Sequence, residues 1–353
     1  MLKKLSKQKI SDIITYGIVL VAFIVMEILI NAGQISSLFE GLMVPLCTYI
    51  ILAISLNLVV GVLGELSLGH AGFMCVGAFT SAFFSKCMQD TITNSIVRFL
   101  IALLIGIVVA AIFGLLIGIP VLRLNGDYLA IVTLAFGEII KNIVNVLFIG
   151  KDSKGFHFST KDVMALNMEP DGKVIVNGPQ GITGAPKDAT FFIGFILVLI
   201  TLFIVLNLIH SRDGRAIMAI RDNRIAAESI GINITKYKLM TFTISAAMAG
   251  AAGVLYGHNL SNLTANTNNF GYNMSINILV FVVLGGIGNI RGSIISAVVL
   301  TLLPELLRGL SDYRMLIYAI VLIVMMLFNW APKAIEWREK YLSFKKNKKE
   351  AVK

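Results

Sequence analysis

The chain has 353 residues, of which 57% are hydrophobic and only 14% are charged. Soluble domains carry about a quarter charged residues, so the composition excludes an ordinary soluble globular protein and indicates a membrane protein. The net charge of +10 would suggest a nucleic-acid partner in a soluble protein. In a membrane protein the position of the charges along the chain matters more, and no nucleic-acid partner is expected.

About ten apolar segments meet or approach the roughly 20 residues that a helix needs to cross a bilayer. In chain order they are 13–30, 40–62, 66–85, 97–122, 128–149, 190–209, 239–257, 275–290, 293–308 and 314–330. The segment 66–85 and the pair between 275 and 308 are short and interrupted by glycine, which suits a half-helix or re-entrant piece. We therefore expect an all-α fold, in which residues 1–353 form a single transmembrane bundle of about ten spans, in contact with membrane lipid.

The positions of lysine and arginine predict the orientation. With the N-terminus in the cytoplasm and ten spans, the inner side receives most of the 30 basic residues. They lie at 3–9, at Arg123, at 212–238, at Arg291 and in a basic C-terminal tail, 331–353. Cytoplasmic loops carry such an excess of basic residues, so both termini are expected in the cytoplasm. This orientation places the loop 150–189 outside and the loop 210–238 inside.

Two of the expected helices carry small residues at every fourth position. One helix has Gly106, Ala110, Gly114 and Gly118, and the other has Ser245, Ala249, Gly253 and Gly257. In lipid, close backbone approach drives helix association, so such stripes indicate packing faces of a tight bundle. Lining a substrate path is the alternative.

Sequence signatures of catalysis are missing from the chain. It has no G-x-x-x-x-G-K-[ST] phosphate loop, so it is not expected to bind ATP in that way itself. Its four histidines lack metal-ligand spacing, and no Ser-His-Asp or paired-carboxylate arrangement is present. The three cysteines are interpreted as small packing residues. We therefore expect no enzyme activity, metal or cofactor in this chain.

A few ionisable residues fall inside the expected spans or near their boundaries. They are Glu27, Glu65, His70, Glu138, Lys141, Glu305 and Arg308. Such residues are costly in hydrocarbon and are functional candidates by default. Glu138 and Lys141 are three positions apart, as are Glu305 and Arg308, and at that spacing each pair neutralises itself on a helix. Glu138, the deepest of them, is either half of a structural pair or a residue of a transport path.

A short helix is expected in the inner loop, within 212-RDGRAIMAIRDNRIAAESIGINITKYK-238. Asp222 is a suitable N-cap, and Gly231 suits the left-handed position that often follows a helix end. The helix between them, 223–230, is about 12 Å long at the usual rise per residue, which is too short to span a bilayer.

The side chains of this helix are expected to separate into two faces. Ile225, Ala226 and Ile230 lie on one side, and Arg224 and Glu228, four positions apart, form a pair on the solvent side. The residues alone leave two interpretations open. The helix either docks into a groove on a cytoplasmic partner or lies on the bilayer surface.

Four stretches, distributed along the chain from residue 64 to residue 308, resemble a known family. They are 64-GELSLGHAGFMCVGAFTSA-82, 126-GDYLAIVTLAFGEIIKN-142, 214-GRAIMAIRDNRIAAESIGINITKYKL-239 and 284-LGGIGNIRGSIISAVVLTLLPELLR-308. In this order they resemble the integral-membrane permease, of the second subunit type, of the branched-chain (hydrophobic) amino-acid ATP-binding-cassette importers. Any one of the stretches alone would be a weak signal.

The resemblance implies that the short inner helix is the coupling helix, which docks on the ATPase. Its residues are Asp222, Asn223, Arg224, Ile225, Ala226, Ala227, Glu228, Ile230 and Gly231. Importer permeases commonly carry Glu-Ala-Ala at this place, followed by Gly after three residues. Here the glutamate follows the two alanines and the glycine comes sooner, so the docking role is supported by position and by the pattern of this particular family.

The resemblance also implies a prokaryotic cell-membrane location and a set of partners. These are two ATP-binding cassette subunits that use ATP and Mg²⁺, a homologous second permease, and an extracytoplasmic binding protein. The loop 150–189 is a candidate landing surface for that binding protein. Candidate path residues are Ser67, Gly69, His70, Thr133 and Glu138, with packing as the alternative role for each.

The expected function is uptake of branched-chain amino acids into the cytoplasm by alternating access. Sister families move urea or short amides, nucleosides and other small solutes with a similar pattern, and these stay open as alternatives. An ion-coupled secondary carrier is a further alternative, which transport without an ATPase would reveal.

Overall fold

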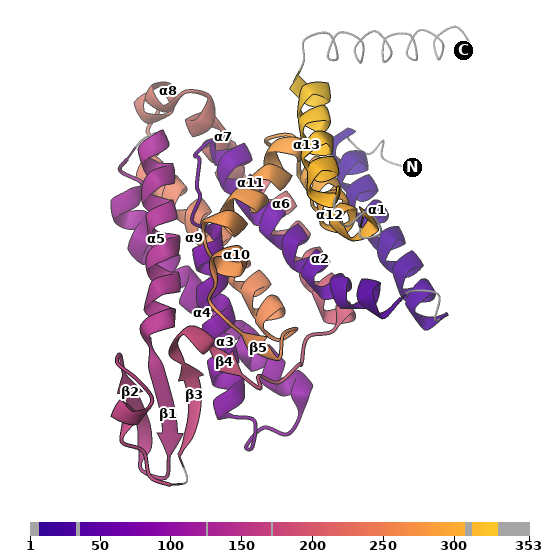
Figure 1. The fold of residues 1–353 in the computed structure, drawn as a ribbon. Helices are drawn as coiled ribbons and strands as arrows, with labels where there is room; N and C mark the ends of the chain where they lie inside the picture. Colours follow the sequence, from indigo (N-terminus) through magenta and orange to yellow (C-terminus); the bar gives the residue numbers. More distant parts are fainter. Residues whose placement is uncertain (1–6, 33–35, 125, 171, 308–312, 331–353) are drawn as a thin grey trace, which may run out of the picture.

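The computed structural model describes residues 7–32, 36–124, 126–170, 172–307 and 313–330 (Figure 1). The basic tail 331–353 and Arg308 lie outside these ranges. Most of the described chain is helical. The helices are α1 (Lys7–Asn31), α2 (Ser37–Asn57), α3 (His70–Cys87), α4 (Ser95–Val121), α5 (Asp127–Val146), α6 (Phe191–His210), α7 (Arg212–Asp222), α8 (Arg224–Ser229), α9 (Ile234–Gly257), α10 (Thr267–Phe270), α11 (Tyr272–Gly285), α12 (Ile290–Leu306) and α13 (Arg314–Trp330), with a π-helical turn η1 (Leu58–Leu63) and 3-10 turns η2 (Met164–Leu166) and η3 (Gly178–Gln180).

Six helical segments of the described ranges are long and apolar enough to cross a bilayer. They are Asp12–Ile30, Phe39–Leu63, Ser95–Val121, Asp127–Val146, Phe191–His210 and Ile234–Gly257. The other four expected segments correspond to α3, α11, α12 and α13, which have 18, 14, 17 and 17 residues. The protein is thus a multi-pass helical membrane protein, and ten complete crossings stay a prediction.

Short polar side chains begin several of these helices. Asn94 Oδ1 accepts from the N–H of Ile96 at the start of α4, and Ser211 Oγ accepts from Gly214 at the start of α7, both at 3.0 Å. Asn233 caps α9 in the same way. Each cap supplies an acceptor for N–H groups that have no partner within the helix, so these residues determine where the apolar runs become helical.

The expectation of an all-α fold is wrong in one region, the loop 150–189. There the chain forms a three-stranded antiparallel sheet in the order β2-β1-β3, from β1 (Phe148–Asp152), β2 (Gly155–Ser159) and β3 (Lys173–Asn177). A second, two-stranded sheet pairs β4 (Ile182–Thr183) with β5 (Asn262–Leu263). The physical reason is visible in β3, whose run of Val174, Ile175 and Val176 favours a strand.

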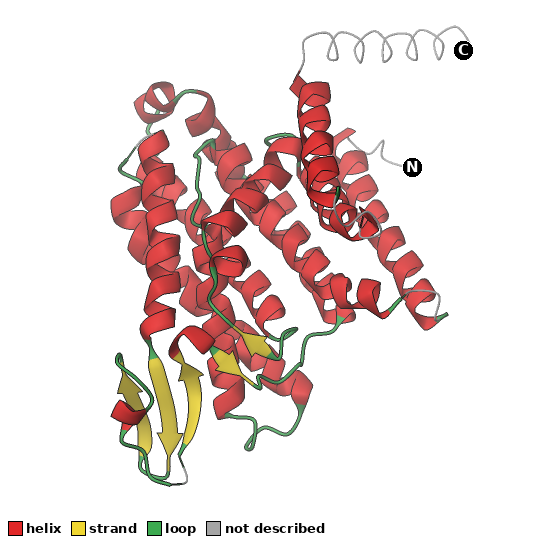
Figure 2. Cartoon of the chain, in the orientation of Figure 1, coloured by secondary structure: helices red, strands yellow, loops and turns green. Residues whose placement is uncertain are grey.

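Figure 2 shows the sheets as a separate cluster at one end of the helical body. In Figure 1 the start of α1, the end of α13 and the α7–α8 pair lie at the opposite end. The ends of the described chain therefore share one side of the molecule with α8, and the sheets occupy the other side.

Helix α9 is the centre of the packing. The predicted stripe of α4 lies against it: a Cβ on Gly114 would come within 2.7 Å of the Ala246 Cβ, and one on Gly106 within 2.3 Å of Val254 Cγ2. The stripe of α9 faces a different helix, because a Cβ on Gly253 would lie 2.0 Å from the Met74 carbonyl oxygen of α3. The two stripes therefore do not face each other, and α9 is packed closely on two sides.

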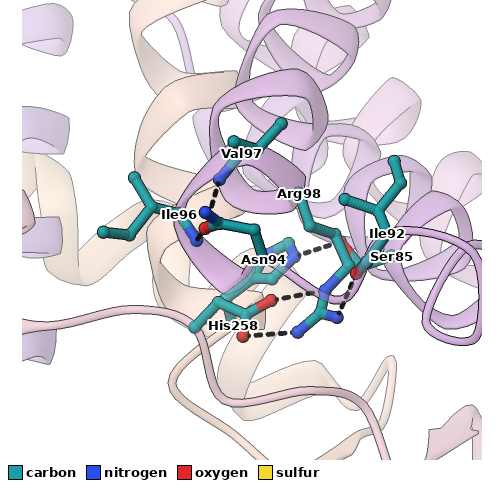
Figure 3. A network of polar contacts seen from close by, with 8 residues as sticks. Ser85, Ile92, Asn94, Ile96, Val97, Arg98 and His258 are labelled. Carbon is teal, nitrogen blue, oxygen red and sulfur yellow. Dashed lines mark hydrogen bonds and ion pairs between the residues drawn. The ribbon is translucent and has the colours of Figure 1, made fainter.

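Polar contacts hold the end of α3 to the end of α9, and the start of α4 to the segment before α6, at the end of the molecule that carries the sheets (Figure 3). Arg98 donates to both carboxylate oxygens of Asp188, at 2.7 and 2.8 Å, and to the Ile92 carbonyl at 3.0 Å. Ser85 Oγ lies 2.8 Å from His258 Nε2, at the end of α9. Both side chains of the Arg98–Asp188 pair are buried. Such a pair holds its segments in one arrangement, because separating it would leave a buried charge uncompensated.

Candidate functional site

Helix α8 forms the corner at the end of the molecule opposite the sheets (Figure 1). Its N-cap is Asn223, whose Oδ1 accepts from the Ala226 N–H at 3.0 Å. The prediction of Asp222 as the cap is wrong by one residue: α7 continues through Asp222, and Asn223 has the extended backbone that a cap requires. Asp222 instead accepts hydrogen bonds from Arg221. Gly231 has φ +86°, the left-handed conformation expected after the helix.

The faces of α8 differ in burial from what its apolar pattern suggests. Ala227 is buried against Ile220 and Ile234, which fixes the helix to α7 and α9. Ile225 and Ile230 are 81% and 74% exposed. Ile225 of α8 and Ile230, the C-cap residue that follows the helix, thus project from the inner loop into solvent. An exposed apolar pair on a short, well-capped helix is suited to a groove on another protein.

Four of the predicted path residues meet where α3 begins. The segment 64–69 packs on α5, where the Leu68 N–H donates to Thr133 Oγ1 at 3.0 Å. A Cβ on Gly69 would lie 2.7 Å from the Thr133 carbonyl oxygen, so glycine permits this approach. His70 Nε2 lies 2.8 Å from Ser245 Oγ of α9.

Two buried polar atoms in this region have no hydrogen-bond partner among the described residues. They are Ser67 Oγ and His70 Nδ1, and both residues are almost completely buried. An unpartnered buried polar group costs about 1–3 kcal/mol. Polar groups retained at such a cost are candidates for a functional role.

The fifth path residue, Glu138, lies on α5, as Thr133 does, and faces the start of α11. Its carboxylate forms an ion pair with Lys141 and accepts from the Tyr272 N–H at 2.8 Å. Lys141 Nζ also donates to Thr267 Oγ1 at 3.2 Å. The predicted pairing of Glu138 with Lys141 is therefore present, and the pair also contacts α10 and the first residue of α11.

Helices α3 and α11 both begin beside the middle of α5. Thr133 and Glu138 lie about 9 and 17 Å from the start of α5, a helix about 30 Å long. The irregular segment before α3 and the break between α10 and α11 thus occur inside the helical body. Discontinuous helices with polar groups at mid-depth are typical of membrane transporters. The fold and this site define a multi-pass membrane transport protein.

Comparison with known proteins identifies the family. Residues 38–328 match the family described as branched-chain amino acid transport system / permease component. The chain belongs to this family. No solved structure matches the chain.

Two relatives named as the high-affinity branched-chain amino acid transport system permease protein LivM, from Salmonella typhimurium and Escherichia coli, are 35% identical over 296 residues. These matches cover 81% of this chain and 67% of each relative. The LivH permease protein of the same transport system in S. typhimurium is 25% identical over 287 residues, covering 79% of this chain and 89% of the relative.

The sequence did not single out two contacts that join the inner loop to the membrane core. The buried Lys238 forms an ion pair with the partly buried Glu65, and Arg221 Nη1 donates to the Gly61 carbonyl at 2.9 Å. The partners are 173 and 160 positions apart. No local pattern of charge or hydropathy encodes such contacts, so sequence reasoning had no signal for them.

Proposed function

We propose that the protein is a membrane-spanning permease subunit of an ATP-driven importer that moves branched-chain amino acids into the cytoplasm by alternating access. The observation that carries this proposal is the exposed apolar pair of Ile225 in α8 and Ile230 at its C-cap, on a member of this permease family. A helix that leaves large apolar side chains in water at one end of a membrane protein is suited to a protein partner at that end.

The partner proposed for α8 is an ATP-binding cassette subunit, two of which would bind and hydrolyse ATP with Mg²⁺. The residues 222–231 form the docking surface within the loop 210–238, and both termini, including the tail 331–353, share its cytoplasmic side. A homologous second permease would complete the membrane part, because the relatives include two permease proteins, LivM and LivH, of one transport system. An extracytoplasmic binding protein would deliver the substrate to the opposite end, where the loop 150–189 folds.

The proposed path runs where α3 and α11 begin. Ser67, Gly69, His70, Thr133 and Glu138 supply polar or small groups at mid-depth, and the breaks at Gly69 and Gly271 are the places where the helical body can open. The chain itself carries out no chemistry in this scheme. ATP hydrolysis in the partner displaces α8, and the helical body alternates between outward and inward openings.

The first test is purification of the tagged chain in mild detergent with whatever co-purifies, followed by reconstitution in liposomes. An ATPase and a second permease should co-purify, and leucine uptake should require ATP and the binding protein. Uptake that follows an ion gradient without ATP would instead indicate a secondary carrier. ATP-driven uptake of urea, a nucleoside or another solute in place of leucine would contradict the substrate.

Neutralising the mid-depth ion pair should separate its structural role from its transport role. In Glu138→Gln, Lys141 loses its anionic partner inside the helical body, so this single substitution should impair both folding and uptake. The double variant Glu138→Gln/Lys141→Met removes both charges, which preserves folding in many buried pairs. If Glu138 lies on the path, the double variant should still bind the ATPase but lose uptake by about tenfold or more, equivalent to ~1.4 kcal/mol. Normal uptake by the double variant would show that the pair is structural.

A further inference from the structure

The α7–α8 corner is connected to the membrane core across a cavity. The cavity has a volume of about 290 Å³, and Gly64, Glu65, Asp127, Arg221, Arg224 and Lys238 are among the residues that line it. It opens beside the direct contact of α7 with the π-helical turn η1, at the end of α2, and it borders the start of α5. Because this space is not filled by side chains, α8 and the last turn of α7 have room to move into it.

Arg221, in the last turn of α7, crosses from the corner to η1. Its Nη1 donates to the Gly61 carbonyl at 2.9 Å. Its Cγ also lies close to Gly64, where an added Cβ would come within 2.5 Å of it. Gly64 has φ +81° and ends the π-turn, so the arginine contacts both the turn and the residue at which the chain changes direction.

The other side of η1 is held by α12 and the loop before it. Asn57, the residue that precedes η1, accepts from the Gly288 N–H at 2.9 Å and donates to Ser293 Oγ at 2.8 Å. A Cβ on Gly61 would lie 2.3 Å from the Gly288 nitrogen. The π-turn therefore has contacts on two sides. On one side lie α12 and the loop before it, and on the other lies Arg221 of the α7–α8 corner.

A second connection reaches the segment beyond Gly64. Lys238 of α9 forms an ion pair with Glu65, and their side chains are 3% and 15% exposed. Three residues after Glu65, the Leu68 N–H donates to Thr133, at the start of the proposed path. A continuous series of contacts thus leads from α8 through Arg221 to η1 and Gly64, and along 65–68 to the start of α3.

Single π-helical turns in α-helices occur frequently at functional sites. We propose that η1 and Gly64 form a hinge, and that Arg221 is the positioning residue that transmits movement of α8 to the segment 64–69. This inference rests on the proposed function, since it requires an ATPase that moves α8.

The hinge predicts that Arg221→Ala uncouples ATP hydrolysis from transport. The purified complex should assemble and hydrolyse ATP at close to the wild-type rate. The amount of leucine transported per ATP should fall by roughly tenfold, within the about 5- to 150-fold typical of coupling between sites. Arg221→Lys, which retains a donor for the Gly61 carbonyl, should restore part of the coupling. Arg215→Ala is the matched control, because Arg215 also lies on α7 but donates to the His210 carbonyl, away from η1.

Each other outcome contradicts the hinge. If uptake and hydrolysis fall in parallel, or if Arg221→Ala transports as well as Arg215→Ala, Arg221 does not transmit movement. If Arg221→Ala does not fold, the same comparison is made with Arg221→Met, which keeps an aliphatic side chain of similar length but has no donor for the Gly61 carbonyl, and unchanged coupling in that variant overturns the proposal. A wild-type complex without ATP-driven uptake would overturn the proposed function itself, which is a result distinct from failure of the hinge.

Discussion

Replacing Ile225 by glutamate should remove the ATP-binding cassette subunit from the purified complex while the permease stays folded. Ile225 is 81% exposed in the isolated chain, so its replacement removes little packing within the protein. In the docked state the same side chain would be buried in the partner's groove, where an unpaired carboxylate is costly. We expect an affinity loss of about 30-fold or more, the ~2 kcal/mol characteristic of an interface anchor. Ile230→Glu should behave alike, because Ile230, the C-cap residue of the same short helix, is 74% exposed.

The measurement is the amount of ATPase recovered with the tagged permease, with thermal unfolding of the permease as the folding check. Met164→Glu is a matched control, because Met164 is 89% exposed but lies at the other end of the molecule, in η2. It should retain the ATPase fully. Wild-type recovery of the ATPase with Ile225→Glu and Ile230→Glu would exclude docking through this face and favour a helix that lies on the bilayer.

The sequence predicted the helical body well because its signals are local. Runs of about 20 apolar residues specify helices in lipid without reference to the rest of the chain. The short inner helix was located to within a residue because Asp222, which directly precedes the observed cap Asn223, and Gly231 were used as local cap signals. Which of the two adjacent residues caps α8 depends on where α7 ends, and cap propensity alone does not decide it.

The sheets and the hinge contacts depend on long-range pairing. Strand β1 pairs with β3 across β2 and the η2 turn, and no strand was predicted in this loop although Val174–Val176 is a β-branched run. The contacts of Arg221 with Gly61 and of Lys238 with Glu65 join residues more than a hundred positions apart. They follow from how α7 and α9 pack on α2, which hydropathy does not encode.

The small-residue stripes were predicted only in part, because their spacing is a local signal but their packing partners are not. Spacing four at Gly106–Gly118 and Ser245–Gly257 predicts that each helix has a closely packed face. It does not say which helix lies opposite each face. The stripe of α4 lies on α9, whereas Gly253 lies on α3.

Adding one methyl group at Gly253 should destabilise the protein strongly. The Cβ of Gly253→Ala would lie 2.0 Å from the Met74 carbonyl oxygen, which is backbone and cannot rotate away, so α3 and α9 must separate. Overpacking of a close interior costs about 1–3 kcal/mol and occasionally more, and a backbone collision belongs at the upper end. The expected result is a marked loss of thermal stability in detergent, or aggregation. Gly41→Ala is the matched control, since nothing lies within 4 Å of its added Cβ, and a helical alanine there should leave the stability unchanged or raise it.

A second pair of variants tests whether the collision, and not glycine itself, is the cause. The Cβ of Gly106→Ala meets a side-chain atom, Val254 Cγ2, at 2.3 Å. Val254→Ala removes that atom, so the double variant Gly106→Ala/Val254→Ala should be more stable than the sum of the two single effects predicts. Met74→Ala should give no such rescue of Gly253→Ala, because its carbonyl oxygen remains in place. If Val254→Ala rescues Gly106→Ala and Met74→Ala also rescues Gly253→Ala, the helices adjust by side-chain movement at both contacts. If only Gly106→Ala is rescued, the rigid contact of the bundle is the one between the backbones of α3 and α9.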